Sequence, residues 1–251
     1  MDLINTLFLS FLEGVTEFLP ISSTGHLILA SNLLKIPQTE FLKSFEIFIQ
    51  LGAILAVVFL YFKKLITDID LWKKIILAFL PSAFFGVMFY GFIKSNLFEN
   101  TFVVILSLLI GGIFIIIFEK YHANKQKAHL GYFDYLKIGL FQVLSMIPGV
   151  SRAMATIFGG MMVGLNRKQA TEFSFLLAIP TMLGATVLDL YKTDVSVWTN
   201  SELNLLIIGF IGSFITSIIA IKFLVKFVQS NNFIVFGVYR VIISIIYYLI
   251  I

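Results

Sequence analysis

The chain has 251 residues, of which 59% are hydrophobic and only 13% are charged, and its mean hydropathy is +0.99. A soluble domain carries about 25% charged residues, so this composition excludes a soluble globular protein and predicts an integral membrane protein. The absence of cysteine excludes disulfides, thiolate metal sites and cysteine nucleophiles, and a net charge of +4 is too small and scattered to argue for nucleic acid.

The first segment, residues 1–34, contains a polar motif that reads Glu-Gly-Val-Thr-Glu-Phe-Leu-Pro-Ile-Ser-Ser-Thr-Gly-His from Glu13 to His26. Proline and polar residues interrupt the segment, so neither arm reaches the roughly 20 residues that span a bilayer. We expect a re-entrant helical hairpin, because broken helices are tolerated at membrane depth where they line a cavity inside the protein.

Long apolar stretches follow, and we expect them to be transmembrane helices at roughly 41–61, 72–93 and 101–118. A second broken segment, residues 133–166, holds the motif Pro-Gly-Val-Ser-Arg at 148–152 and predicts a second re-entrant hairpin. Three more apolar stretches then follow, at roughly 172–191, 203–227 and 233–250.

The second half of the chain repeats the first at an offset of about 128 to 131 residues. Pro20-Ile-Ser-Ser23 aligns with Pro148-Gly-Val-Ser151, which makes Ser23 the expected counterpart of Ser151. Because each repeat has an odd number of spans, the second must be inverted relative to the first. We predict one all-α transmembrane domain, 1–251, with inverted repeats at about 1–125 and 130–251, about six transmembrane helices and two re-entrant hairpins.

Basic residues are concentrated on one side of this arrangement. Lys63 and Lys64 share one loop, and Lys120 and Lys127 share another on the same side. By the positive-inside rule that side is cytoplasmic, and the opposite loops, around 94–101 and 192–202, are poorer in basic residues. Inverted repeats with broken helices commonly place their site at the midplane, so we expect the two polar motifs to meet there.

Glu13 and Glu17 are four residues apart and therefore lie on one face of a helix, with side chains about 5–6 Å apart. Two such charges need a shared proton, a divalent cation or a basic partner. Two carboxylates at an aqueous helix end are the plain alternative. Since they lie in an apolar run near His26, we expect them to bind a metal or to steer protons.

Pro20 is expected to end the first arm, and Ser22, Ser23 and Thr24 supply hydroxyls that can cap a new helix. The free N–H groups of such a helix start are suited to an anion. His26 lies three residues after Ser23, so an imidazole base and a hydroxyl nucleophile can meet across one turn. A capped hairpin helix and an interfacial histidine are the structural alternatives.

In the second motif, Ser151 and Arg152 open the helix that follows Pro148-Gly149. The planar fork of arginine donors suits phosphate oxygens, although the side chain could instead snorkel or pair with a glutamate. Thr156 adds a hydroxyl on the same face. We expect the substrate to be bound by Ser151, Arg152, Thr156, Ser22 and Thr24.

Other polar residues are expected to have lesser roles. Glu46 and Gln50 are four residues apart and are expected to line the same cavity, and Gln142 follows the same hairpin logic. Ionisable residues near the predicted span ends are expected to face headgroups or water: Glu119, Glu172, Asp189 and Arg240.

These motifs make the sequence resemble the undecaprenyl-diphosphatase family, the bacterial bacitracin-resistance phosphatases. The resemblance covers nearly the whole chain and rests on Glu13 to His26, Phe-Glu-Ile-Phe-Ile-Gln-Leu-Gly at 45–52, Pro-Gly-Val-Ser-Arg at 148–152 and Glu-Phe-Ser-Phe-Leu-Leu-Ala-Ile-Pro at 172–180. One departure is that the family usually has Ser-Gly after the Ser-Arg pair, where this chain has Ala153 and Met154.

The resemblance implies hydrolysis of the terminal phosphate of a C55 isoprenoid diphosphate, which regenerates the monophosphate lipid carrier of cell-wall synthesis. It also implies a site that opens to the outer face of the bacterial cytoplasmic membrane, and a divalent cation, Mg²⁺ or Ca²⁺, which we place at Glu13 and Glu17. Catalysis is expected from Glu13, Glu17, Ser23 and His26, with either Ser23 activated by His26 or a water held by Glu17 and His26 as the nucleophile.

The expected partners are the polyprenyl diphosphate and membrane lipids, with no nucleic acid and with a homodimer left open. A second hypothesis from another class keeps the same architecture. In it the protein is a secondary transporter or a flippase of polyprenyl phosphate, since inverted repeats are common in transporters.

Overall fold

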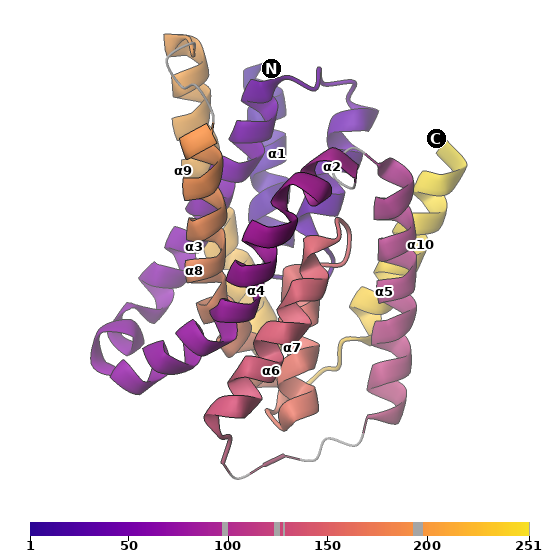
Figure 1. Ribbon diagram of the computed structural model, residues 1–251. Coiled ribbons are helices and arrows are strands. Elements are labelled where there is room, and N and C mark those ends of the chain that lie inside the picture. Colours follow the sequence, from indigo (N-terminus) through magenta and orange to yellow (C-terminus); the bar gives the residue numbers. More distant parts are fainter. Residues whose placement is uncertain (97–99, 123–125, 128, 193–197, 251) are drawn as a thin grey trace.

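The computed structural model describes residues 1–96, 100–122, 126, 127, 129–192 and 198–250, and these residues form helices and connecting turns without a strand (Figure 1). The elements in chain order are α1 (Leu3–Thr16), α2 (Ser23–Leu33), α3 (Glu40–Thr67), α4 (Ile69–Asn96), α5 (Thr101–Tyr121), α6 (Tyr132–Val143), the 3₁₀ turn η1 (Leu144–Met146), α7 (Arg152–Val163), α8 (Arg167–Lys192), α9 (Asn200–Phe227) and α10 (Ile234–Ile250).

Long apolar helices occupy the six predicted stretches. Helices α3, α4, α5, α8 and α9 are long and apolar enough to cross a membrane. Helix α10, with 17 residues, is at the lower limit of the about 17–25 residues that span one. The chain is therefore a multi-pass, all-α integral membrane protein, as its composition predicts.

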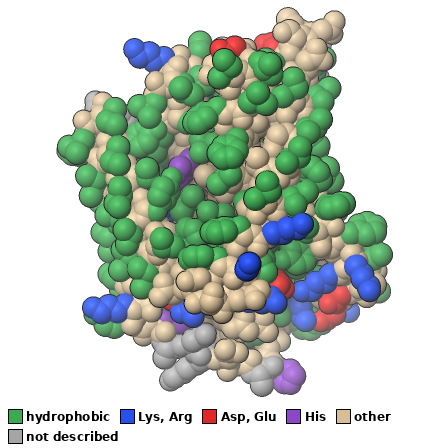
Figure 2. Space-filling view, turned by 180° about the vertical axis from the view of Figure 1, so that it is seen from behind, with side chains coloured by type: hydrophobic (Ala, Val, Ile, Leu, Met, Phe, Trp, Pro, Cys, Tyr) green, Lys and Arg blue, Asp and Glu red, His purple; other side chains and the backbone are tan. Residues whose placement is uncertain are grey.

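Apolar and charged side chains occupy different zones of the surface, as expected for a protein that crosses a bilayer. Apolar side chains cover the middle of the face in Figure 2, and most of its Lys and Arg side chains lie at the lower end. Figure 1 places the α3–α4 connection and the C-terminal end of α5 at this same end. The loops expected on the opposite side are only partly described, because 97–99 and 193–197 lie outside the described residues.

The two broken segments fold as pairs of short helices. Helices α1 and α2 lie toward the end that holds the N-terminus, whereas α6 and α7 lie toward the opposite end (Figure 1). The longest of these four helices has 14 residues, which is about 21 Å at 1.5 Å per residue and too short for a hydrocarbon core of about 30 Å. The tips of the pairs meet inside the bundle, where Arg240 bonds to backbone carbonyls of both.

Helices of the two halves are interleaved. Helix α9 packs on α1 and α3, and α4 packs in the same manner on α6 and α8. Helix α3 also contacts α8, and α5 contacts α10. These contacts have the symmetry that two repeats predict, because exchanging α1–α5 for α6–α10 leaves them unchanged. The repeat boundary near 125–130 and the inverted topology stay predictions.

Helices α2 and α7 begin with matching caps. The side chain of Ser22 accepts a hydrogen bond from the Gly25 amide at 3.3 Å, and that of Ser151 accepts one from the Met154 amide at 3.1 Å. Both serines have positive φ, 74° and 77°. The caps pair Ser22 with Ser151, so the expected match of Ser23 with Ser151 is wrong by one position, because the second tip has one more residue between proline and cap than the first.

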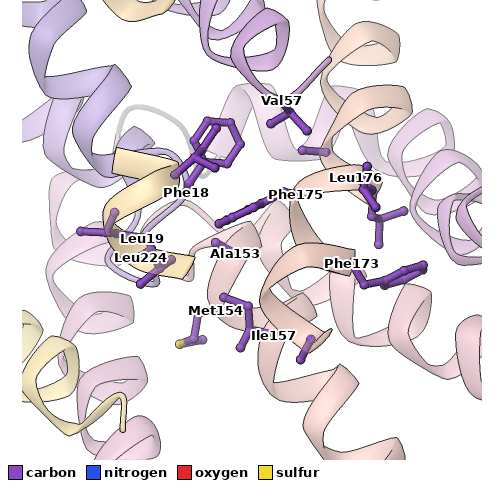
Figure 3. Close-up of a cluster of buried hydrophobic side chains, with 14 of the residues drawn as sticks. Phe18, Leu19, Val57, Ala153, Met154, Ile157, Phe173, Phe175, Leu176 and Leu224 are labelled. Atoms are coloured by element: carbon purple, nitrogen blue, oxygen red, sulfur yellow. The ribbon is translucent and has the colours of Figure 1, made fainter. Parts of the chain in front are cut away.

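The largest apolar cluster lies around the tips and draws on both halves (Figure 3). Phe18 of the first tip packs edge to face on Phe175 of α8, with ring centroids 5.2 Å apart. Such a pair contributes about 0.5–1.5 kcal/mol beyond the area that it buries. Ala153 and Met154 of α7 and Leu224 of α9 belong to the same cluster, which holds the polar tip residues in a dry setting.

Candidate active site

The carboxylate of Glu17 lies where the two hairpin tips meet. One of its oxygens is 2.6 Å from Nη2 of Arg152, and the other accepts a hydrogen bond from the hydroxyl of Ser23. All three side chains are largely withdrawn from solvent, with 5% of Glu17 and 10% of Arg152 exposed. Burying a carboxylate charge costs much free energy unless the charge is paired and hydrogen-bonded, and for Glu17 each half of the chain supplies a partner.

Arg152 is the first residue of α7, and its guanidinium is only partly used. Nη1 donates to the carbonyl of Ser174 at 2.8 Å, and Nη2 binds Glu17. Nε is buried and has no hydrogen-bond partner among the described residues. A buried donor without a partner costs free energy, so this nitrogen is suited to an anionic oxygen of a ligand.

Thr156 and Ser174 form hydrogen bonds with Arg152 and with each other. The Thr156 hydroxyl lies 2.6 Å from that of Ser174 and donates to the carbonyl of Arg152 at 2.9 Å. Thr156 is thus part of the site, but its hydroxyl is engaged with protein atoms. Ser174 is not among the binding residues predicted from the sequence. The signal that could have found it is its place in the 172–180 motif.

The imidazole of His26 is held by two partners other than Ser23. Nδ1 lies 2.7 Å from the carbonyl oxygen of Ser22, and Nε2 lies 2.8 Å from the hydroxyl of Tyr239. The expected contact between His26 and Ser23 is therefore replaced by these two bonds. Ser23 instead donates to Glu17, so the hydrogen-bond acceptor beside this hydroxyl is a carboxylate and not the imidazole.

Glu13 lies one turn before Glu17 on α1 and is fully buried. Neither of its carboxylate oxygens has a hydrogen-bond partner in the described part of the chain, and the charges of Glu17 and Glu46 act on it. Two free carboxylate oxygens fit a hard divalent cation. The described residues hold no group of three or more His, Cys, Asp or Glu, so further ligands would be carbonyls, hydroxyls or waters.

Glu17 fits the cation less well than Glu13, because both its oxygens already have partners. The hydroxyls of Ser22 and Ser151 are used as caps, and Thr24 lies half-buried in the first turn of α2. What the predicted binding residues share is their place at two helix N-termini, both adjacent to Glu17. Free N–H groups at such ends favour an anion.

Two residues expected at span ends are buried instead. Arg240 has no exposed surface and donates to carbonyl oxygens at both tips and on α5. The side chain of Glu119 is 1% exposed; it pairs with Arg167 and accepts a hydrogen bond from the amide of Phe233. Both predictions of an exposed position are wrong, because packing of α5 on α10 covers these side chains.

Glu46 and Gln142 were also predicted to line the cavity, and the structure gives them different surroundings. Glu46 accepts a hydrogen bond from Ser31 on α2 at 3.1 Å and acts electrostatically on Glu13, which places it near the site. Gln142 is buried, and its side-chain amide is engaged by Ser82 on α4 and Thr181 on α8.

An apolar groove of about 240 Å³ reaches the site from the side. It runs between α1, α2 and α10, and its lining includes Leu12, Leu29, Ile243 and Tyr247 as well as His26. Apart from Tyr247, the rest of this lining is apolar, and its imidazole, that of His26, lies on the helix that also carries Ser23. The groove therefore lies beside the helix whose N-terminus forms part of the polar tip.

Comparison with known proteins identifies the family. The family model described as "Bacitracin resistance protein BacA" matches residues 6–246. A protein of Sulfurihydrogenibium sp. is 50% identical over 99% of both chains, and one of Aquifex aeolicus is 51% identical over 95% of this chain and 94% of its own. One of Wolinella succinogenes is 46% identical over 98% and 97%. All three are named undecaprenyl-diphosphatase. With a polar site built from both hairpin tips and a match over nearly its whole length, the chain belongs to the bacitracin resistance protein BacA family.

Proposed function

We propose that this protein is an undecaprenyl-diphosphatase, an enzyme that hydrolyses the terminal phosphate of the C55 isoprenoid diphosphate and regenerates the monophosphate lipid carrier for cell-wall synthesis. The name shared by its relatives supports this activity. The single observation that carries it is Glu17 held between the Ser23 hydroxyl and the Arg152 guanidinium, where two helix N-termini meet. From the family description we also propose that it confers bacitracin resistance.

In the proposed reaction Glu17 is the base and Ser23 the nucleophile. The Ser23 proton passes to Glu17, Oγ bonds to the terminal phosphorus, and the bond from that phosphorus to the bridging oxygen breaks. The lipid monophosphate leaves, and a water then cleaves the phosphoserine and releases inorganic phosphate. A water held by Glu17 and His26 that attacks directly is the alternative. Phosphoryl transfer demands mainly positioning and charge stabilisation, for which Nε of Arg152 is available.

A divalent cation, Mg²⁺ or Ca²⁺, would neutralise charge on the diphosphate. Glu13 would hold it with the two oxygens that lack partners among the described residues, and Glu17 would be a second ligand only by giving up a present bond. Binding of a cation would also relieve the repulsion between the buried carboxylates.

The apolar groove beside His26 is proposed to take the isoprenoid chain. We place the protein in the bacterial cytoplasmic membrane with the basic end of Figure 2 in the cytoplasm and the site open to the outer side, in accord with the positive-inside rule. Membrane lipids are its surroundings, and the homodimer stays a prediction.

Phosphate release from undecaprenyl and farnesyl diphosphate by the purified protein in detergent tests the proposal, with Mg²⁺, with Ca²⁺ and with chelator. We expect cation-dependent release that falls by at least about 10³-fold in Ser23→Ala and in Glu17→Gln. Ser145→Ala is the matched control, since its hydroxyl lies in the other tip and, among the described residues, donates to the carbonyl of Gln142. A trapped phosphoserine at Ser23 would support the covalent route, whereas full activity of Ser23→Ala would exclude it.

The interleaved helices favour one other function, a flippase or secondary transporter of polyprenyl phosphate. It predicts alternating access without phosphate release. If the folded wild-type protein released no phosphate from either substrate, lipid transport in vesicles would become the leading hypothesis.

A further inference from the structure

The hydroxyl of Tyr239 on α10 is joined to the imidazole of His26 on α2. The hydroxyl oxygen lies 2.8 Å from Nε2, and the two rings lie within 7° of parallel with centroids 5.5 Å apart. The two residues are 213 positions apart, and Tyr239 belongs to none of the polar motifs. A stacked, hydrogen-bonded pair that joins distant helices suggests a role for Tyr239 at the site.

The partners of His26 define which nitrogen carries the proton. Nδ1 faces the carbonyl oxygen of Ser22 at 2.7 Å, and a carbonyl can only accept, so Nδ1 carries a hydrogen. In the neutral ring the lone pair is therefore on Nε2, where it accepts from the hydroxyl of Tyr239. Nε2 is the nitrogen that can take up a proton.

Tyr239 is itself held in place by its neighbour. Arg240, the next residue of α10, donates to carbonyls of both tips and of α5, which fixes the helix against the site. The ring of His26 also lines the apolar groove. Tyr239 thus presents its hydroxyl to Nε2 from a rigid support beside the proposed path of the lipid chain.

We propose that Tyr239 is a positioning residue for His26. Its hydroxyl holds the imidazole as the Nδ1–H tautomer and orients Nε2. When Nε2 takes a proton, the bond reverses: Nε2–H donates to the tyrosine oxygen, and the hydroxyl hydrogen, which tyrosine keeps, turns away from the ring. A hydroxyl serves both states because it donates and accepts. The effect on turnover rests on the proposed function, in the route where Glu17 and His26 hold the attacking water, whereas the effect on the imidazole does not.

Nitrogen NMR of the ring tests the pairing without substrate. The chain has three histidines, so His122→Gln with His129→Gln leaves His26 as the only one to label with ¹⁵N. We expect the Nδ1–H tautomer, with the Nε2 resonance displaced toward that of a protonated nitrogen by the bond it accepts. Tyr239→Phe should abolish this displacement, and Tyr247→Phe, which alters another tyrosine of α10 whose ring lines the same groove, should leave it unchanged.

Turnover provides the second readout. Loss of one hydrogen bond of about 1.4 kcal/mol corresponds to about tenfold, so kcat for farnesyl diphosphate should fall about tenfold in Tyr239→Phe while KM stays within about twofold. An unchanged Nε2 resonance in Tyr239→Phe, or an equal change in Tyr247→Phe, would overturn the inference. An inactive wild type with the expected spectra would refute the proposed function and leave the pairing intact.

Discussion

Replacing Arg240 by lysine should loosen both hairpin tips while it keeps the positive charge. Arginine has five N–H donors, and in Arg240 every one of them meets a backbone carbonyl, at 2.8–3.3 Å. These carbonyls belong to both tips and to α5: Pro20, Gly149, Val150, Ser107 and Leu108. Gly111 leaves room for the guanidinium of Arg240, since a Cβ at residue 111 would lie 2.2 Å from Nη2 of this arginine.

The magnitude follows from counting donors. Lysine has three, so at least two of the five carbonyls lose their partner. Each buried polar group left unsatisfied costs about 1–3 kcal/mol, which gives about 2–6 kcal/mol for Arg240→Lys. Because 1.4 kcal/mol is a factor of ten, opening of the tips should become roughly 30-fold to 20,000-fold more frequent.

Amide hydrogen exchange measured by mass spectrometry checks this directly. Peptides that cover residues 17–25 and 146–155 should exchange faster by at least about 30-fold in Arg240→Lys. Lys222→Arg, a charge-preserving change at an exposed residue of α9, serves as the control and should leave both peptides unchanged. Wild-type exchange in Arg240→Lys, or the same acceleration in Lys222→Arg, would refute the reasoning.

Two further predictions concern the backbone. Ser151→Ala should lower the unfolding free energy by about 0.5–2 kcal/mol because the helix cap is lost. Ser151→Gly should leave the unfolding free energy nearly unchanged, because glycine tolerates the positive φ of 77°. Thermal unfolding in detergent measures both variants, and a larger loss for Ser151→Gly than for Ser151→Ala would contradict the argument. Gly52→Ala should cost about 1–3 kcal/mol in the same assay, since its Cβ would lie 2.3 Å from the Phe210 carbonyl oxygen, and Gly91→Ala, with open space around it, should cost nothing.

Features that depend on local pattern were predicted from the sequence. The predicted stretch 41–61 lies inside α3, and 233–250 matches α10 within one residue, because hydropathy over about 20 residues decides whether a segment enters the bilayer. The starts of α2 and α7 followed from serines that can cap a helix after a proline break. The membrane class and both helical pairs are therefore confirmed.

Features that depend on which helices touch were not predictable in this way. Arg240 lies in the middle of a helix for which the hydropathy pattern indicates only an apolar segment. Its hydrogen bonds go to carbonyls of three other segments, namely α5 and the two tips. The contact of Tyr239 with His26 was not predictable either, since the two residues are more than two hundred positions apart in the sequence. A buried arginine in a membrane protein calls for partners, and the sequence does not say where they are.

Pairing the caps of α2 and α7 shows which position of each half contributes to the proposed site. With Ser22 paired to Ser151, the first residues of α2 and α7 become equivalent, and these are Ser23 and Arg152. Both bind Glu17, one through each carboxylate oxygen. Two equivalent positions thus carry different side chains, a hydroxyl in one half and a guanidinium in the other, around a single carboxylate. A strictly symmetric pair would place two nucleophiles or two cations there. In the proposed mechanism this difference between the two positions matters, because two helix N-termini alone would favour an anion, whereas a hydroxyl beside a carboxylate could also attack one.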